Sequence, residues 1–563
     1  MTSPSISLDQ SEERVSRGRL SAAFDAISHD ARLAWAPLAG VVLLAFALNA
    51  WHLNTVGLGN TYYAAAVRSM TTSWHNFFFG AFDPGGMITV DKPPVFLWIG
   101  AASARVFGYS SWSLLLPSAI AGAATVGLLW IIVRRTFGTF AATVAALTLA
   151  LTPITVAVDR LNLPEPFFIL ALVGAAGAIM RSLEEPRGYR WVVLAGLLVG
   201  IAFNTKMLAA WIPGPALAVT LLAGASWPWR PNWRPMLGRV AILGVVTLVA
   251  SASWMVVTDL TPASARPYIG GSTNNTVTNL VFGYNGFGRV DGGQGFGGAS
   301  RNAPARPQVA PPNRAPGGTA PGGTAPNVVP GAPTDGRGAF GPGAPAAPGG
   351  FGAPGAFGGG PGGPGAANGP GGIIAGQPGP FRMIDSANGG QIGWFLSFAL
   401  LGAALALWLW RTDRLRRGSV VMWLGWVLLY AGVFSYAQGI YHSYYTSALA
   451  PGIAALTGIG ALAASDLVRR DRRWLLAPVA LVLAALALQF HLQDRVPTYY
   501  GWLRPWTIVV TGAGLLLMVA GVLRRFSPRL GMALIVAGLL LLPGGWSVSE
   551  AANTSLNTTL PQA

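Results

Sequence analysis

The chain has 563 residues, of which 52% are hydrophobic and only 10% are charged, and its mean hydropathy is +0.48. Soluble domains carry about 25% charged residues, so this composition excludes an ordinary soluble domain and indicates a membrane protein. The net charge is +17, and 0 cysteines leave no disulfide or thiol chemistry. The chain contains only two lysines, Lys92 and Lys206, and all its other fixed positive charges are arginines.

The N-terminal residues 1–32 are polar, include acids, and lack the short basic start and cleavage site of a signal peptide. We therefore expect a cytoplasmic tail followed by a retained membrane anchor. Runs of about 20 apolar residues predict an all-α polytopic membrane protein with about 13 transmembrane helices. These runs lie near 33–53, 112–133, 137–157, 163–180, 190–205, 207–225, 238–258, 392–410, 419–437, 443–465, 474–490, 505–523 and 529–547.

A shorter apolar run, 93–108, follows the Pro-Pro of "VDKPP" and is interrupted by Arg105, so we interpret it as interfacial or re-entrant. If it does not cross, most arginine-rich connections fall on one side, which the positive-inside rule makes cytoplasmic. Arginines at an anionic inner leaflet also account for the net charge, so we expect no nucleic-acid partner. The sequence thus predicts a multi-pass protein of the cell membrane with a site that faces outside.

Two long segments fall on the predicted outer side: the first outer loop, 54–111, and a second loop, 261–391. The second loop is so rich in Gly, Pro and Ala that it cannot bury enough apolar area, and we expect disorder from about 292 to 380. The segment before it, "STNNTVTNLVFGYNGFGR", is expected to be ordered. The predicted organisation is an N-terminal catalytic module (33–260), this loop, a C-terminal transmembrane module (392–547) and an outer tail (548–563).

Polar and ionisable residues gather at the predicted outer ends of the helices. Ionisable groups at membrane depth are costly and usually mark a site or a pathway. Simpler structural interpretations stand beside this one. Asp159 and Arg160 can form a helix-end ion pair, and "YHSYY" can be an aromatic belt at the headgroup level. "FDPGG" can be an ordinary turn, and the lysines can be snorkelling side chains at helix ends. The candidates are Asn60, Tyr62, Tyr63, His75, Asp83, Asp91, Lys92, Asp159, Arg160, Glu165, Lys206, His442, Tyr444 and Tyr445.

These residue types together suit the transfer of a sugar from a lipid phosphate. A lysine is a compact point charge that binds phosphate oxygens without a planar partner. A carboxylate can act as the general base that takes a proton from an acceptor hydroxyl. Tyr, Trp and His can stack on a sugar ring and hydrogen-bond to it. The sequence therefore indicates a glycosyltransferase.

Four segments resemble motifs of glycosyltransferase family 39, in the C superfamily that includes protein O-mannosyltransferases and the lipid A aminoarabinose transferase. The resemblance runs from about 34 to 260 and from 392 to 465, and it is greatest to a bacterial ArnT-like branch. The segments are "VDKPPVFLWIGAASARVFGYSSWSLLLPSAIAG", "RLNLPEPFF", "GLLVGIAFNTKM" and "HSYYTSALAPGIAAL".

The resemblance implies a polyprenyl-phosphate sugar as donor, transfer on the outer face and inversion at the anomeric carbon. Lys92 and Lys206, with Arg160, are then the predicted donor phosphate-binding residues. Asp91 stands where the family has Glu, and Glu165 stands where it has an outer-face Asp. The predicted sugar- and acceptor-binding residues are Asn60, Tyr62, Tyr63, His75, His442, Tyr444 and Tyr445.

The chain departs from the family at Gly59-Asn60, where an acidic pair usually supplies the catalytic base. Asp83 or Asp91 can replace this base, with Asp159 or Glu165 assisting, and of these we predict Asp83. The alternatives are a different mechanism or a chain without transferase activity. We expect no cofactor, and since no Asp-x-Asp pair occurs at the predicted outer face, a divalent cation is not supported. The acceptor is expected to be a lipid, glycan or protein.

Two other classes of function stand beside this prediction. A lipid or sugar transporter or flippase would favour an inverted repeat and charges at mid-membrane. The two halves share no duplicated pattern, and the charges lie near helix ends. A scaffold that presents the Gly/Pro-rich loop is the third class, and a loop deletion would separate it from a transferase.

Overall fold

The computed structural model describes residues 35–185, 187–224, 233–290, 376–439, 441–524 and 528–553. Within these ranges the chain is helical, and the only β-pairing consists of two isolated bridges, which confirms the predicted all-α polytopic class. The predicted tail 1–32 and residues 554–563 lie outside the described residues, as does the predicted disordered segment up to residue 375.

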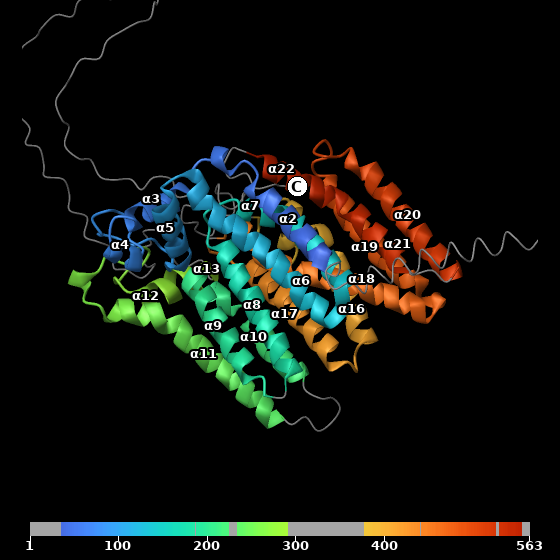
Figure 1. Ribbon diagram of the computed structural model, residues 1–563, viewed down its shortest axis with the longest axis horizontal. Coiled ribbons are helices and arrows are strands. Elements are labelled where there is room, and N and C mark those ends of the chain that lie inside the picture. Colours follow the sequence, from blue (N-terminus) through green and yellow to red (C-terminus); the bar gives the residue numbers. More distant parts are fainter. Residues whose placement is uncertain are drawn as a thin grey trace, which may run out of the picture. The chain divides into compact units, whose positions relative to one another are not determined.

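The helices of the bundle follow the predicted apolar runs (Figure 1). They are α2 (Ala36–Ala50), α6 (Ser111–Ala150), α8 (Glu165–Glu184), α9 (Tyr189–Lys206), α10 (Gly214–Ala223), α11 (Trp233–Leu260), α16 (Leu396–Leu409), α17 (Arg414–Tyr436), α18 (Ala450–Arg470), α19 (Leu476–Gln493), α20 (Leu503–Arg524), α21 (Pro528–Leu539) and α22 (Leu541–Ala552).

In the described ranges ten helices are long and apolar enough to span a membrane, or eleven if the bent pair α21–α22 is one span. The predicted count of 13 is therefore not confirmed. The difference lies in two places. The predicted runs 112–133 and 137–157 form the single element α6, which is interrupted by a non-helical Gly138, and α10 has only 10 residues.

The core of the bundle is built around α18, which is buried along its apolar length. Its neighbours are α6, α16 and α17. Small residues allow close approach there: a side chain at Gly402 of α16 would collide with the backbone of Gly460 on α18. By contrast, α11 and α20 leave most of their apolar residues unburied, as helices that face lipid do.

Residues 54–111, the predicted first outer loop, contain three short helices, α3 (Thr61–Met70), α4 (Trp74–Phe79) and α5 (Val95–Phe107). Side chains of Asn60 and Ser73 cap α3 and α4, and Pro94 precedes α5. With 13 residues, α5 rises only about 20 Å, too short to cross a bilayer, in agreement with the interpretation of 93–108.

A hairpin between α4 and α5 joins this loop to the segment that follows α11. Ala81 pairs with Thr89 across the hairpin, and Ile88 forms a parallel bridge to Tyr268. The segment continues as η4 (Ala263–Ala265), α12 (Val277–Asn279), the π-helix η5 (Leu280–Phe287) and α13 (Gly288–Val290). Figure 1 shows α12 and α13 beside α4 and α5 at one end of the bundle. The two segments, both predicted to be outer, thus lie side by side there.

Short elements complete the described chain. They are η2 (Leu53–Thr55), α7 (Pro153–Asp159), η3 (Met207–Trp211), η7 (Arg382–Ile384), α15 (Gly389–Ile392), η8 (Gly393–Phe395), η9 (Ser443–Leu449) and η10 (Arg472–Leu475). Of these, η9 matters most for the site, because it carries Tyr444 and Tyr445.

Candidate active site

Lys92 lies directly after the hairpin and is buried against a carboxylate. Its Nζ is 2.6 Å from Oδ2 of Asp91, and it donates to Oδ1 of Asn285 at 3.0 Å. Asn285 in turn donates from Nδ2 to the carbonyl oxygen of Asp91 at 2.7 Å. These bonds tie the start of α5 to the π-helix η5, which is far away in sequence.

Arg289 extends this contact toward η9. Its guanidinium donates to Oδ1 of Asn285 at 3.2 Å and to the hydroxyl of Tyr445 at 2.7 Å. It also lies over the ring of Tyr284, 4.9 Å from the centroid. One asparagine oxygen therefore accepts from two cations, Lys92 and Arg289.

Lys206, at the last residue of α9, forms an ion pair with Glu165, the first residue of α8. Its Nζ lies 3.9 Å from the ring centroid of Tyr445. Glu165 is fully buried, and its Oε2 has no hydrogen-bond partner in the described part of the chain. A buried carboxylate oxygen without a donor is costly, so this atom calls for an explanation.

Tyr445 therefore joins two ion pairs into one group, which we name the cation cluster: Asp91, Lys92, Glu165, Lys206 and Arg289. Three cations and two carboxylates leave it with one net positive charge. A buried site of this charge suits a ligand with one negative charge.

The charges of the cluster act on one another. Burial alone would raise the pKa of Asp91, but Lys92 and Arg289 hold it below its usual range, so this carboxylate is ionised. Burial, together with Arg289, lowers the pKa of Lys92 to about 8 despite the neighbouring Asp91. Burial and the three cations also lower the pKa of His442 to about 3, so its imidazole is neutral at pH 7.

The predicted aromatic residues fall into two sets. His442 stacks on Tyr444, with ring centroids 5.1 Å apart, and both contact Tyr445 beside the cluster. The hydroxyl of Tyr62 accepts from the backbone amide of Asp91 at 3.3 Å. Tyr63 is buried and packs edge-on against Phe96 of α5. Tyr62, His442, Tyr444 and Tyr445 therefore touch the cluster or its neighbours, and Tyr63 packs between Tyr62 and α5.

Three other predicted residues make local structural contacts. Asn60 caps α3 by accepting from the amide of Tyr63 at 3.1 Å. His75 places Nε2 3.2 Å from the carbonyl oxygen of Ala265, which links α4 to η4. Asp83 accepts from the amides of Met87 and Ile88, at 2.9 and 3.0 Å, at the tip of the hairpin. Since a strand rises about 3.3 Å per residue, this tip lies roughly 13 Å along the hairpin from Asp91.

Asp159 and Arg160 do not pair with each other. Arg160 donates to the carbonyl oxygens of Leu48 and Trp51, at 3.1 and 2.6 Å, at the end of α2. Asp159 accepts from Nδ2 of Asn49 at 3.1 Å, and burial raises its pKa well above the usual range. Neither contact joins the cation cluster.

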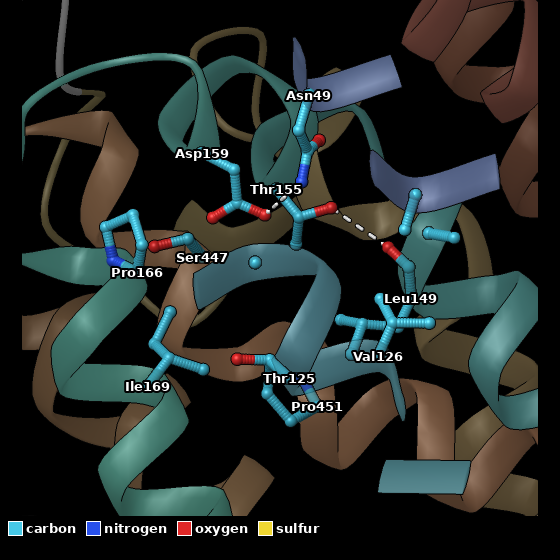
Figure 2. A pocket seen from close by; sticks show the side chains of 13 residues that line it. Asn49, Thr125, Val126, Leu149, Thr155, Asp159, Pro166, Ile169, Ser447 and Pro451 are labelled. Carbon is cyan, nitrogen blue, oxygen red and sulfur yellow. Dashed lines mark hydrogen bonds between the residues drawn. The ribbon is translucent and has the colours of Figure 1, made fainter. Parts of the chain in front are cut away.

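Figure 2 shows Asp159 beside a small cavity, with Thr125, Thr155 and Ser447 on the other walls. The cavity has a volume of about 20 Å³, room for about one water molecule. Asp159 thus lies in a small polar cavity between helices.

Sequence reasoning missed Asn285 and Arg289. Both lie in the segment expected to be ordered, on the π-helix and α13, and π-helical turns are frequent at functional sites. The one signal that could have found them is the string "YNGFGR", which sets an amide and a guanidinium four residues apart. In the described ranges no group of three or more His, Cys, Asp or Glu residues could hold a metal ion.

Residues 91–254 match the family described as dolichyl-phosphate-mannose-protein mannosyltransferase. Two Bacillus subtilis (strain 168) proteins, each provisionally named a mannosyltransferase, are similar over most of their length. YycA is 35% identical over 542 residues, 93% of this chain and 77% of that protein. YkcB is 38% identical over 557 residues, 93% of this chain and 76% of that protein.

A third relative is the undecaprenyl phosphate-alpha-4-amino-4-deoxy-L-arabinose arabinosyl transferase of Pseudomonas paraeruginosa (strain DSM 24068 / PA7), 26% identical over 174 residues, 30% of this chain and 31% of that protein. Among solved structures, ArnT from Cupriavidus metallidurans bound to undecaprenyl phosphate has a similar fold. The TM-score is 0.52 at 16% identity, covering 92% of this chain and 77% of that chain.

The helical bundle and these relatives define a polytopic membrane glycosyltransferase. The chain belongs to the mannosyltransferase-like proteins of glycosyltransferase family 39, and its fold is similar to that of ArnT. The resemblance inferred from the four sequence motifs is therefore confirmed.

Proposed function

We propose that this enzyme transfers a sugar from a polyprenyl-phosphate donor to an acceptor hydroxyl or amine on the extracytoplasmic face of the cell membrane. The observation that carries this proposal is the cation cluster, which is buried and has one net positive charge. A polyprenyl-phosphate sugar is a phosphodiester with one negative charge, so the cluster matches its charge.

The cluster also suits the chemistry of the leaving group. When the bond between the sugar carbon and the phosphate oxygen breaks, its electron pair stays on the phosphate, whose negative charge grows. Lys92 and Arg289, already held by the shared oxygen of Asn285, can meet this growing charge without rearrangement. Their attraction is greater in the transition state than in the ground state, and only such a difference speeds the reaction.

The proton of the acceptor must pass to a base as the new bond to the sugar forms. We assign this role to Glu165, because its Oε2 is fully buried and has no donor among the described residues. An acceptor hydroxyl would supply that donor. Asp83, the base predicted from sequence, stays an alternative, and its place at the hairpin tip makes it the less favoured one. Asp91 instead holds Lys92 in place.

The aromatic residues around the cluster provide a surface for the sugar. Tyr62, His442, Tyr444 and Tyr445 lie at or next to it, and tyrosine and histidine combine an apolar face with a polar edge. Since the pKa of His442 is about 3, its imidazole would contact the sugar as a neutral ring. The acceptor class, whether lipid, glycan or protein, is left to experiment.

The donor can be identified with purified protein and a panel of radiolabelled polyprenyl-phosphate sugars, using membranes as the source of acceptor. We expect label from one donor to move into acceptor with the wild-type protein and not with Lys92→Ala. If no donor in the panel is used, or if Lys92→Ala moves label as fast as wild type, the proposed role of the cluster is wrong.

The predicted orientation can be tested separately, because the chain has 0 native cysteines. Single cysteines at Met87, which is exposed on the hairpin, and at Arg187, between α8 and α9, can be labelled with a membrane-impermeant thiol reagent in intact cells. We expect Met87→Cys to react and Arg187→Cys to react only after lysis. The reverse pattern would place the site on the cytoplasmic side.

A further inference from the structure

Four arginines lie together where α18 ends and η10 begins: Arg469, Arg470, Arg472 and Arg473, which we name the arginine patch. All four are exposed. The single acid among them, Asp471, uses its carboxylate to accept from the backbone amide of Arg473 at 2.9 Å. Four guanidinium groups and one carboxylate leave the patch with three net positive charges.

Nearby arginines of the bundle find partners within the chain. Arg135, Arg181 and Arg190 pair with Glu184 or Glu185. Arg529 pairs with Asp466, one turn before the patch on α18, at 3.2 Å.

The side chains of the arginine patch differ from these paired arginines. In the described ranges none of them makes an ion pair, a hydrogen bond or a ring contact. The charge of the patch is therefore not neutralised by the described part of the chain.

The patch borders an apolar surface that marks a depth in the membrane. Trp474 follows it and packs against Trp408 of α16, with ring centroids 5.2 Å apart and the rings tilted, and both rings are nearly half exposed. Leu476, two residues further on, is 77% exposed. Tryptophan is enriched at the level of lipid headgroups, so a charged zone, an aromatic zone and an apolar zone follow one another within eight residues.

We propose that the arginine patch binds the phosphate of an anionic phospholipid, with Trp408 and Trp474 at the headgroup level and Leu476 against the acyl chain. Guanidinium groups bind phosphate oxygens through paired N–H bonds, which suits a phosphodiester headgroup. Free phosphate would engage only the charged half of this surface. The site is separate from the cation cluster. The arginine patch lies at the C-terminal end of α18, whereas Tyr445, which contacts the cluster, lies just before the N-terminal end of α18.

The test compares phosphatidylglycerol with phosphatidylcholine bound to the full-length protein, measured by native mass spectrometry after extraction in detergent. Arg472→Gln with Arg473→Gln should reduce retained phosphatidylglycerol about 25-fold, because each arginine near an anionic surface contributes on the order of fivefold. The matched control, Arg135→Gln with Arg190→Gln, removes the same charge from arginines already paired with glutamates and should change retention less than twofold.

Three results would overturn the proposal. Equal loss in both double variants would show a general effect of charge rather than a site. Release of the lipid by millimolar inorganic phosphate would show that the patch recognises the phosphate ion alone. Loss of thermal stability of the patch variant in detergent without added lipid would show that these arginines serve the protein's own fold.

Discussion

The two ends of α8 carry the same type of charge pair in opposite settings. Glu165, the first residue, is fully buried and bound to one cation, Lys206. Glu184 and Glu185, at the other end, are partly exposed and share Arg135, Arg181 and Arg190. The helix has 20 residues, so roughly 30 Å separates the two settings.

The difference shows that a buried ion pair and an exposed network of ion pairs contribute differently to stability. Burying an ion pair costs hydration free energy that the attraction between the charges hardly recovers. Such a pair is therefore weak evidence for stability and better evidence for a functional role. A shared, exposed network tolerates the loss of any member, because solvent and the remaining partners compensate. Substitutions at the buried end should therefore act strongly and individually, and substitutions at the exposed end weakly.

The largest effect is expected at Lys92. Lys92→Ala removes a charged donor at the leaving phosphate and should lower kcat/KM for the polyprenyl-phosphate sugar by about 10²–10³. Lys92→Arg keeps the charge in a bulkier, planar group and should retain a fraction of the activity. Initial rates with purified protein provide the measurement, and thermal unfolding of each variant shows whether the fold persists. Wild-type rates in Lys92→Ala would exclude a phosphate contact.

Glu165→Gln tests the buried end of α8. It leaves Lys206 buried beside an amide, which should cost about 3–5 kcal/mol of unfolding free energy. Glu165→Gln combined with Lys206→Met removes both charges and should recover most of that loss. Denaturant unfolding in detergent measures both.

The same variants separate the role of Glu165 in stability from its role in catalysis. Lys206→Met alone is the control, because Lys206 belongs to the cation cluster. If Glu165 is the base, the double variant is less active than Lys206→Met. Activity restored along with stability would remove Glu165 as the base.

The helices and the two lysines could be predicted from the sequence, because apolar runs and rare charges are local signals. The contact of Asp91 with Lys92 could also be predicted from the sequence, because the two residues are adjacent and both side chains are mostly buried. Asn285 and Arg289 could not be placed, because Lys92 lies 193 residues from Asn285 and Tyr445 lies 156 residues from Arg289. Only the fold of the loop after α11 brings them to Lys92.

Asp159 and Arg160 show that adjacency in sequence does not by itself predict an ion pair. Neighbours in sequence suggest an ion pair, but α7 ends between them and their side chains leave in different directions. Arg160 meets the free carbonyl groups at the end of α2, and Asp159 turns toward Asn49 and the small cavity of Figure 2. The direction of a side chain at a helix end depends on backbone geometry that composition does not reveal.

A pH dependence follows from the lowered pKa of Lys92, about 8 instead of 10.5. The ammonium binds phosphate below this pKa and is lost above it. kcat/KM reports groups of the free enzyme, so its alkaline fall should begin near pH 8 and reach about tenfold per pH unit. Arginine stays charged in this range, so Lys92→Arg should lack the alkaline fall. A fall that persists in Lys92→Arg would assign it to another group.

The smallest effect is expected at the exposed end of α8, where Glu184→Gln makes the same chemical change as Glu165→Gln on the same helix. Glu184 binds Arg135 and Arg181 at 2.7 and 2.6 Å, but all three side chains reach solvent, and Glu185 can still accept from Arg181. The unfolding free energy should fall by less than about 1 kcal/mol, and less still in high salt, because exposed pairs are screened. A loss as large as that of Glu165→Gln would mean that the network carries the fold, and that the contrast between the two ends reflects position rather than burial.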